Sequence, residues 1–441
     1  MISDIKIGDL LCENVSVNHK GHLCFAGQDV TELAKEYGTP LYLMDEDRIR
    51  ERCRTYREAL RDSFGDAAHA AYASKAASFK EIYRIMADEE MYVDVVSCGE
   101  INTAHSAGFP LSRALFHSNN KTDEDVSFAM ERGVGYFVVD NEEELFAIDK
   151  EAKRLGVRQK VLLRLTPGID PHTFAAVSTG KIDSKFGSAI ATGQAMEITK
   201  VALSLPSLDL AGYHCHIGSQ VFDSEVYLRA ADVMLTFIAE CRDRLGFTAR
   251  VLDLGGGFAV RYLPSDPEVD IAKNIVTIGD FIKQICTDLS LPVPEIILEP
   301  GRSIVADAGM TVYTVGTVKK IPDFANYVSV DGGMTDNVRF AMYRSPYTLF
   351  AANKMKSDNT FTASVVGRCC ESGDIIQEKV VLPASIRRGD IVACLTTGAY
   401  NYSMASNYNR IPRPPVVMLR GGESRVVVRR ETLDDLAALD V

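Results

Sequence analysis

The sequence lacks three features that would each point to a particular class of protein: a long apolar run, a basic leader and an excess of basic residues. Without an uninterrupted apolar run of about 18 residues, a transmembrane helix is excluded. The N-terminus, MISDIKIGDLLCENV, is acidic where a signal peptide needs a basic region and then an apolar core. The chain has 60 acidic and 48 basic residues, a net charge of −12, which disfavours binding to nucleic acid or to an anionic membrane surface. We therefore expect a soluble, cytoplasmic enzyme.

The ten cysteines include no C-x-x-C pair. A zinc ribbon and a thioredoxin-type redox site are therefore unsupported. In a cytoplasmic chain of this size we expect most of these cysteines to be small, buried, reduced hydrophobic residues.

The length of 441 residues allows two or three domains, or one α/β barrel with an appended domain. A helix is predicted over 45–60, and eight short apolar runs follow it, alternating with helix-like polar stretches. Strands that alternate with helices form a parallel sheet, so eight such units predict a (β/α)8 TIM-type barrel over 36–305. The eight runs are AAYAS, MYVDVVS, RALFHS, GYFVVD, KVLLRL, LAGYHCHI, RVLDLG and PEIILEP.

The chain after Gly301 has a different pattern, with β-rich runs separated by Gly, Pro, Asp and Asn. This pattern predicts a C-terminal antiparallel β-domain. The first 35 residues are also β-like, with VSVN, HLCFAG and a short helix in TELAKEYG. We therefore predict a β-sandwich or β-barrel-like domain built from 1–35 and 306–441.

Polar side chains follow the apolar runs of the predicted barrel. Catalytic groups of such barrels lie at the C-terminal ends of the strands. So many polar residues at these ends suggest a polar, anionic ligand over the barrel mouth. The residues are Lys75, Asp94, His117, Asp140, Arg164, His216, the loop Gly255–Gly257 and Glu299.

Lys75 lies in AYASKA, among small residues that leave space beside its amine. A lysine in a confined site can lose its proton and form a Schiff base. The alternative, favoured for an isolated lysine, is a solvent-exposed residue at a helix start.

Two further motifs each allow a functional and a structural interpretation. The glycines of LDLGGGF let backbone N–H groups approach a phosphate, or they form a tight turn. Glu299, in ILEPGR, has a carboxylate that can keep a heterocyclic nitrogen protonated, as a pyridoxal ring requires, or it forms a salt bridge to Arg302.

His214 and His216 share one strand face and form a possible zinc pair. No matching cluster of acidic residues or histidines completes such a site, so we predict no metal. Two polar loops, RCCESGD and GAYNYSMASNYN, complete the set of candidate functional segments.

Taken together and in order, these motifs resemble the diaminopimelate decarboxylases. That family belongs to the alanine-racemase-like, fold type III pyridoxal-phosphate decarboxylases. The resemblance covers the chain from about residue 30 to the C-terminus. It is carried by AYASKA, DVVSCGE, LLRLTPGIDPHT, DSKFG, GYHCHIGSQ, DLGGGF, EPGR, CCESGD and GAYNYSMASNYN.

The resemblance implies pyridoxal 5'-phosphate as cofactor and a role for each matching residue. Lys75 would bind the cofactor covalently, His216 would stack on its ring and Glu299 would hold its nitrogen. The phosphate would lie against Ser219, Gly256, Gly257, Gly301, Arg302 and Tyr400.

The resemblance also implies a substrate and a homodimer with shared active sites. Decarboxylation of meso-2,6-diaminopimelate at its D-centre would give L-lysine and CO2, the last step of lysine biosynthesis. Cys370 and Glu371 would come from the other subunit, the thiol as proton donor and the carboxylate as partner of the distal ammonium. The distal carboxylate would be bound by Arg302, Arg339 and Tyr343, with Tyr400 also in contact with substrate.

Other functions stay open on sequence grounds. A relative with the same cofactor would act on carboxynorspermidine, arginine, ornithine or a carrier-bound amino acid. A metal-dependent barrel hydrolase would use His214 and His216, and a non-catalytic cofactor-binding protein would be coloured but inactive. Arg302 and Arg339, taken alone, would be ordinary salt-bridge residues. Ser118 and Phe174 depart from the usual family pattern at the predicted barrel mouth.

Overall fold

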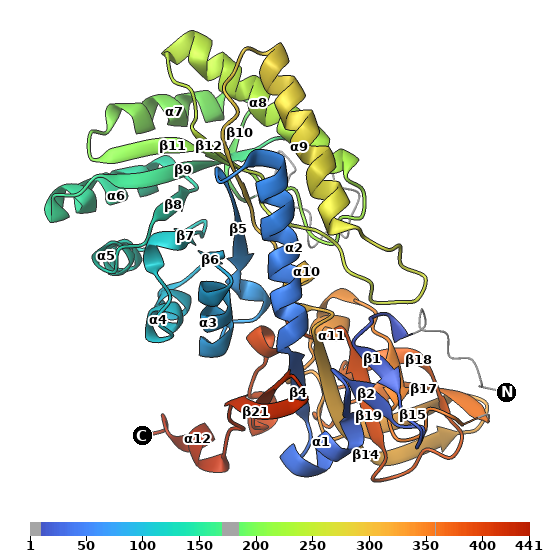
Figure 1. The fold of residues 1–441 in the computed structure, drawn as a ribbon. Coiled ribbons are helices and arrows are strands. Elements are labelled where there is room, and N and C mark those ends of the chain that lie inside the picture. The colour runs from blue at the N-terminus through green and yellow to red at the C-terminus, as the bar shows by residue number, and fades with distance from the viewer. Residues whose placement is uncertain (1–9, 170–184, 358) are drawn as a thin grey trace. The chain divides into compact units, whose positions relative to one another are not determined.

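The computed structural model describes residues 10–169, 185–357 and 359–441 (Figure 1). Phe174 and the motif residues around it lie outside the described residues. The chain divides into two compact units, here called the barrel unit and the sheet unit. The barrel unit comprises Arg52–Ala259 and Val269–Gly301; the sheet unit comprises Met1–Glu51, Val260–Glu268 and Arg302–Val441.

The barrel unit contains a closed ring of eight parallel strands, which confirms the predicted TIM-type fold. Each strand pairs with the next, and the last pairs with the first to close the ring. Every predicted apolar run forms one of these strands. They are β5 (Ala68–Ala73), β6 (Tyr92–Val95), β7 (Ala114–Phe116), β8 (Tyr136–Val139), β9 (Gln159–Thr166), β11 (Leu208–His214), β12 (Val251–Asp253) and β13 (Glu295–Leu298).

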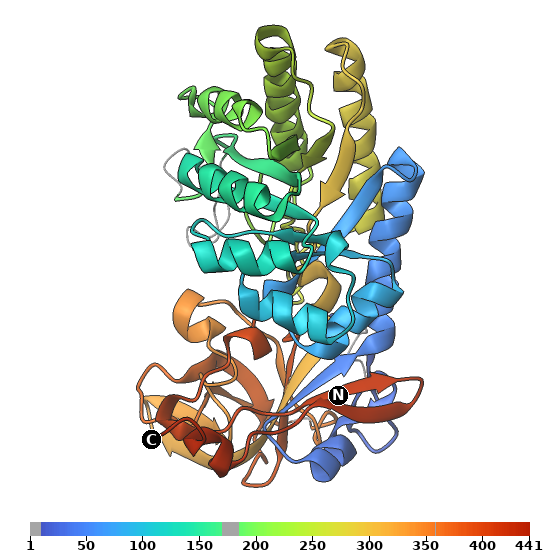
Figure 2. The same ribbon diagram turned by 90° about the vertical axis from the view of Figure 1, so that its left-hand side faces the viewer.

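Helices cover the outside of this ring (Figures 1 and 2). The predicted helix over 45–60 is present as α2 (Glu46–Phe64). A two-residue strand, β10 (Ser188–Ala189), pairs in parallel with the end of β9. The other helices are α3 (Lys80–Asp88), α4 (Cys98–Ser106), α5 (Asp123–Glu131), α6 (Glu142–Leu155), α7 (Gln194–Ser204), α8 (Glu225–Leu245) and α9 (Ile271–Asp288).

The interior of the ring is packed with side chains, as is usual for this fold. One buried cluster takes residues from most of the strands: Ala71, Leu115, Tyr136, Val138, Leu162, Ala211, Val251 and Ile297. Gly212 lies at an irregularity in the pairing of β11 with β9, and a Cβ there would lie 1.8 Å from the carbonyl oxygen of Val251. Only glycine permits this close approach of β11 to β12.

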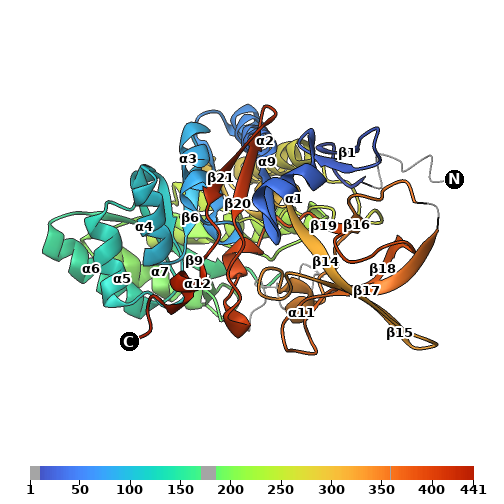
Figure 3. The same ribbon diagram turned by 90° about the horizontal axis from the view of Figure 1, so that it is seen from below.

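The sheet unit is built on a mixed sheet with the strand order β18-β17-β15-β14-β4-β20-β21 (Figure 3). Most of its pairings are antiparallel as predicted, but β15 pairs with β17 and β20 pairs with β4 in parallel. The strands are β4 (Leu41–Asp45), β14 (Gly309–Ile321), β15 (Ala325–Val330), β16 (Leu349–Ala351), β17 (Thr360–Val366), β18 (Ile375–Pro383), β19 (Ile391–Leu395), β20 (Val416–Arg420) and β21 (Glu423–Val428).

Both ends of the chain contribute to the sheet unit. The N-terminal strands β1 (Val15–Val17), β2 (Leu23–Phe25) and β3 (Gln28–Asp29) form a small sheet of their own, followed by α1 (Val30–Tyr37). Leu23 and Phe25 pack in one buried cluster with residues of β4, β14, β19 and β20. The N-terminal strands therefore join the unit by packing. Its short C-terminal helices are α10 (Arg302–Val305), α11 (Arg339–Tyr343) and α12 (Leu433–Ala437).

The predicted start of the barrel at residue 36 is wrong. Leu41–Asp45 forms β4, which pairs with β14 and β20 and therefore belongs to the sheet unit. The run LYLMD is buried along its whole length, and its sequence resembles a barrel strand because a central strand of either sheet needs apolar residues on both faces. Within the described ranges, no helix combines the length and apolar character needed to cross a membrane.

A buried ion pair joins the loop between β7 and α5 to the first turn of α6 in the barrel unit. The ammonium of Lys121 contacts the carboxylate of Glu144, and both side chains are almost completely inaccessible. Lys121 also donates to the carbonyl oxygens of Val138 and Ser118, at 2.8 and 3.2 Å. Burial lowers the pKa of Lys121 and raises that of Glu144, so each charge depends on the other.

We predict that Lys121→Met lowers the free energy of unfolding by about 3–5 kcal/mol, because it leaves Glu144 buried without its partner. The double variant Lys121→Met/Glu144→Leu should lose less of the free energy of unfolding, since both buried charges have then been removed. Lys200→Met, which removes the exposed pair to Glu197, is the control and should cost about 0–1 kcal/mol. Urea unfolding followed by circular dichroism measures all three, and equal losses for Lys121→Met and Lys200→Met would contradict the prediction.

Candidate active site

Lys75 lies directly after β5, in a short 3-10 turn over Ser74–Ala76. Its Nζ is 3.6 Å from Oδ2 of Asp94 on β6; the lysine side chain is 49% exposed, whereas that of Asp94 is 1% exposed. The amine is therefore open to a ligand while a buried carboxylate orients it.

Glu299 directly follows β13 and is buried, with a histidine beside each of its carboxylate oxygens. Nε2 of His117 lies 2.6 Å from Oε1, and Nε2 of His214 lies 3.2 Å from Oε2. The two imidazole rings meet edge to face, with their centroids 4.9 Å apart. Strands β7, β11 and β13 thus bring these three side chains together at one end of the barrel.

The neighbours of Glu299 favour its ionised form. Burial alone would raise the pKa of Glu299, but His117 and His214 lower it well below its ordinary value. Burial lowers the pKa of His214 to about 4, so its ring is neutral and donates from Nε2. Burial and the charge of Glu299 raise the pKa of Asp253, at the end of β12, well above its ordinary value.

The loop Gly255–Gly257 packs so closely on its neighbours that no side chain fits. A Cβ at Gly255 would lie 2.8 Å from Nδ1 of His216, one at Gly256 would lie 1.9 Å from the carbonyl oxygen of Glu299, and one at Gly257 would lie 2.3 Å from that of Gly218. The glycines therefore permit both the close packing and the approach of an anion to the backbone. Gly301 makes a similar approach, with its Cβ position 2.8 Å from Cβ of Ala73.

His216 and Ser219 lie in the loop after β11, next to the glycine loop. The N–H of Gly256 donates to Nδ1 of His216 at 3.3 Å. Burial, followed by the positive charges of Lys75 and Arg164, lowers the pKa of His216 well below its ordinary value. A neutral, flat ring is suited to stacking on an aromatic ligand.

These groups fit pyridoxal phosphate. The cofactor needs an accessible amine, an anion beside its pyridine nitrogen and N–H groups around its phosphate. Lys75 offers the amine, Glu299 offers the anion, and the glycine loop offers the N–H groups. Oε1 of Glu299 is buried near His117 without a well-aligned hydrogen bond, so it can accept one from a pyridinium N–H.

A second cluster lies within the sheet unit and contains two buried arginines around the ring of Tyr400. The guanidinium of Arg302 is 4.8 Å from the ring centroid and that of Arg339 is 5.3 Å from it. Arg302 donates to the hydroxyl of Tyr262 at 2.7 Å. Arg339 also lies 5.7 Å from the ring of Tyr343. The cluster thus contains four of the residues predicted to bind substrate.

Two observations suggest that this cluster binds an anion. Nε of Arg339 is buried without a hydrogen-bond partner among the described residues, and a buried guanidinium N–H without an acceptor is costly. Tyr400 has a φ of 63°, a left-handed conformation that is strained for a tyrosine. A carboxylate of a ligand would satisfy the free donor.

Cys370 and Glu371 lie in the loop 368–374 of the sheet unit, and both are exposed. The N–H of Cys370 donates to Oδ1 of Asn409 at 2.8 Å. Asp374 fixes the start of the loop by accepting the N–H of Cys369 at 2.7 Å and that of Met334 at 2.6 Å. A loop held by these hydrogen bonds therefore presents the thiol and the carboxylate to solvent.

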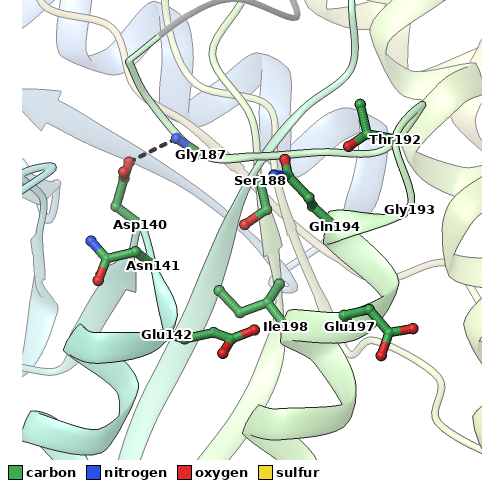
Figure 4. A pocket seen from close by; sticks show the side chains of 10 residues that line it. All are labelled: Asp140, Asn141, Glu142, Gly187, Ser188, Thr192, Gly193, Gln194, Glu197 and Ile198. Carbon is green, nitrogen blue, oxygen red and sulfur yellow. Dashed lines mark hydrogen bonds between the residues drawn. The ribbon is translucent and has the colours of Figure 1, made fainter.

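A polar pocket of about 530 Å³ lies beside the ends of β8 and β10 in the barrel unit (Figure 4). Asp140 lines it and accepts the N–H of Gly187 at 2.9 Å. Glu142 and Glu197 add two more carboxylates to its wall. Asp140, one of the polar residues predicted at a strand end, thus faces this pocket and holds the backbone at Gly187.

The structure separates the two histidines of the possible zinc pair. His214 lies with His117, Asp253 and Glu299, whose potential ligand atoms are all within 4.8 Å of one another. His216 lies instead against the glycine loop. The histidines at 214 and 216 do not form the pair that a hydrolase would need.

Three residues of the Glu299 cluster are absent from the site that the sequence predicts: His117, His214 and Asp253. In the sequence, His117 is only a polar residue at a strand end, and His214 is only a possible metal ligand. Asp253 was available as the last polar residue before LGGG, but nothing in the local pattern shows that it meets Glu299. Tyr262 of the arginine cluster was also missed, because it lies in a segment without a recognisable motif.

Comparisons with known proteins agree with this chemistry. The family described as "Pyridoxal-dependent decarboxylase, pyridoxal binding domain" matches residues 46–306. Diaminopimelate decarboxylase of Bacillus subtilis is 44% identical over 96% of this chain and 96% of its own length. Diaminopimelate decarboxylase of Mycobacterium tuberculosis is 41% identical over 97% of both chains.

The fold is also similar to solved structures of decarboxylases. The diaminopimelate decarboxylase of M. jannaschii in complex with L-lysine has a TM-score of 0.90 and 32% identity, covering 99% of both chains. A lysine/ornithine decarboxylase of Vibrio vulnificus with bound putrescine is more distant, with a TM-score of 0.74 and 25% identity over 89% of this chain and 97% of its own. The chain therefore belongs to the diaminopimelate decarboxylase family of pyridoxal-dependent decarboxylases.

Proposed function

We propose that the chain decarboxylates meso-2,6-diaminopimelate at its D-centre to L-lysine and CO2, the last step of lysine biosynthesis. The observation that carries the proposal is the pair of buried arginines around Tyr400, in a chain 44% identical to a diaminopimelate decarboxylase. Guanidinium groups bind carboxylates in bidentate fashion. Ornithine and lysine lack the second carboxylate that such a cluster would hold.

The residues of the matching motifs would hold the cofactor. Lys75 would bind it covalently, His216 would contact its ring, and Glu299 would accept a hydrogen bond from its nitrogen. The phosphate would be held by Ser219, Gly256, Gly257 and the segment Gly301–Arg302, with the hydroxyl of Tyr400 as a further donor.

The reaction needs an electron acceptor and a proton donor. When bound, pyridoxal phosphate would supply the acceptor for the electron pair left on Cα as the bond to the carboxylate breaks and CO2 departs. Glu299 would stabilise a positive charge on the cofactor's nitrogen. The thiol of Cys370 then gives its proton to Cα, and Glu371 binds the distal ammonium.

The proton donor comes from a second subunit in this proposal. Cys370 and Glu371 are exposed on a loop fixed by Asp374, where a neighbouring copy of the chain can reach them. The enzyme is then a homodimer with shared active sites. The cytoplasmic location expected from the sequence stays a prediction.

The substrate is tested by measuring CO2 release from meso-diaminopimelate, ornithine, arginine and carboxynorspermidine. We expect turnover of diaminopimelate and little of the others. Arg339→Met should reduce kcat/KM for diaminopimelate about 10- to 150-fold, because it removes hydrogen bonds to a charged group. Arg344→Met, an exposed arginine of the same segment, is the control and should leave kcat/KM unchanged. Preference for a substrate with one carboxylate would contradict the proposal.

The shared site is tested with a heterodimer of a Lys75→Ala subunit and a Cys370→Ala subunit, purified through two different tags. One of its two sites then has both Lys75 and Cys370 intact, so we expect about half of the wild-type activity. A heterodimer of Lys75→Ala and His216→Ala is the control and should be inactive, because both changes affect the subunit that binds the cofactor. Equal inactivity of the two heterodimers would rule out the shared site.

A further inference from the structure

Asp253 connects the glycine loop to Glu299 through hydrogen bonds. It is the last residue of β12 and is fully buried. Its Oδ1 accepts the N–H of Gly255 at 2.8 Å. The carbonyl oxygen of Gly255 in turn accepts the N–H of Glu299, also at 2.8 Å. The carboxyl group of Asp253 therefore fixes Gly255, the first residue of the glycine loop, and Gly255 in turn holds the backbone of Glu299.

The second oxygen of Asp253 has a different environment. Oδ2 is buried without a donor among the described residues, and a hydrogen bond to the side chain of Glu299 is one of the causes that raise the pKa of Asp253. The carboxyl groups of Asp253 and Glu299 approach each other within 4.8 Å, and two adjacent carboxylates in a buried place cannot both be ionised. One proton must therefore be present in the pair.

The surrounding residues decide which carboxyl group carries that proton. Nε2 of His117 and Nε2 of His214 lie at 2.6 and 3.2 Å from the two oxygens of Glu299, and these contacts favour the ionised form of Glu299. Asp94 adds further negative potential at Asp253, whose pKa is raised by burial and by Glu299. The proton therefore belongs on Asp253.

We propose that Asp253 is a positioning residue that acts on both ends of the cofactor site: its Oδ1 fixes the phosphate-binding loop, and its protonated Oδ2 keeps Glu299 as a single oriented anion. The proposal rests on the assigned roles of Glu299 and of the glycine loop. In the holoenzyme, the one negative charge of the pair then balances the one positive charge of a pyridinium nitrogen. A second negative charge would disturb this balance.

The variants Asp253→Asn and Asp253→Ala test the proposal in the holoenzyme. Asparagine is neutral, accepts the Gly255 N–H with its oxygen and donates to Glu299 with its amide. We expect Asp253→Asn to retain cofactor affinity within about threefold, and Asp253→Ala to weaken it roughly 5- to 150-fold through the loss of buried hydrogen bonds. The readout is the dissociation constant of pyridoxal phosphate, followed by the visible absorption of the bound cofactor.

Infrared spectroscopy tests the protonation state directly and does not depend on turnover. We expect the wild-type holoenzyme at neutral pH to show a carbonyl stretch of a protonated carboxylic acid that Asp253→Asn lacks, separate from the bands of Glu100 and Asp336, whose pKa values burial raises to about 7. Asp209→Asn, at the opposite end of the neighbouring strand β11 and hydrogen-bonded to Arg250, is the control and should retain it. The band also keeps the proposal testable if Asp253→Ala fails to fold.

Three results would overturn the inference: a band that persists in Asp253→Asn, an Asp253→Asn variant that loses cofactor as severely as Asp253→Ala, or an Asp253→Ala variant with wild-type affinity. None of them depends on which amino acid the enzyme decarboxylates. Failure of the proposed substrate would instead appear in the CO2 assay, with the infrared band and the cofactor affinity unchanged.

Discussion

Glu299 is a carboxylate in a fully buried position, and its charge must be stabilised there by neighbouring groups. An isolated buried carboxylate would take up a proton. His117 and His214 prevent this by contacting one carboxylate oxygen each, and Asp253 holds the proton that the acidic pair requires. The chemistry proposed for the site depends on this arrangement, because only an ionised Glu299 keeps a pyridine nitrogen protonated and able to accept electrons.

The barrel supplies the geometry for this cluster. The four side chains come from the ends of β7, β11, β12 and β13, and strands that are far apart in sequence meet only because the ring closes. The glycine loop then approaches Glu299 and His216 more closely than any side chain would permit. The same glycines therefore permit the close packing of the loops, and in the proposed function they also bind the phosphate.

Local sequence patterns predicted much of this structure. All eight barrel strands are present, because a buried parallel strand produces a short apolar run with a polar residue at its end. The patterns could not assign β4, since LYLMD would suit a central strand of either unit. They also missed the parallel pairings β15–β17 and β20–β4, because strand direction depends on partners distant in sequence.

Local sequence patterns predicted only part of the candidate site. Lys75, His216 and Glu299 stand in motifs that resemble a known family, so each could be assigned a role singly. The contacts of Glu299 with His117, His214 and Asp253 depend on which strand ends face each other across the ring, and one sequence contains no local signal for that. The clustering of Arg302, Arg339 and Tyr400 likewise joins segments about 40 to 100 residues apart.

The most direct test of the account is the nitrogen-15 NMR spectrum of holoenzyme containing pyridoxal phosphate labelled at the pyridine nitrogen. We predict the chemical shift of a protonated pyridine nitrogen in the wild type, and the shift of a neutral nitrogen in Glu299→Gln, whose amide cannot balance the positive charge. A neutral nitrogen in the wild type, or a protonated one in Glu299→Gln, would contradict the central role of the buried carboxylate.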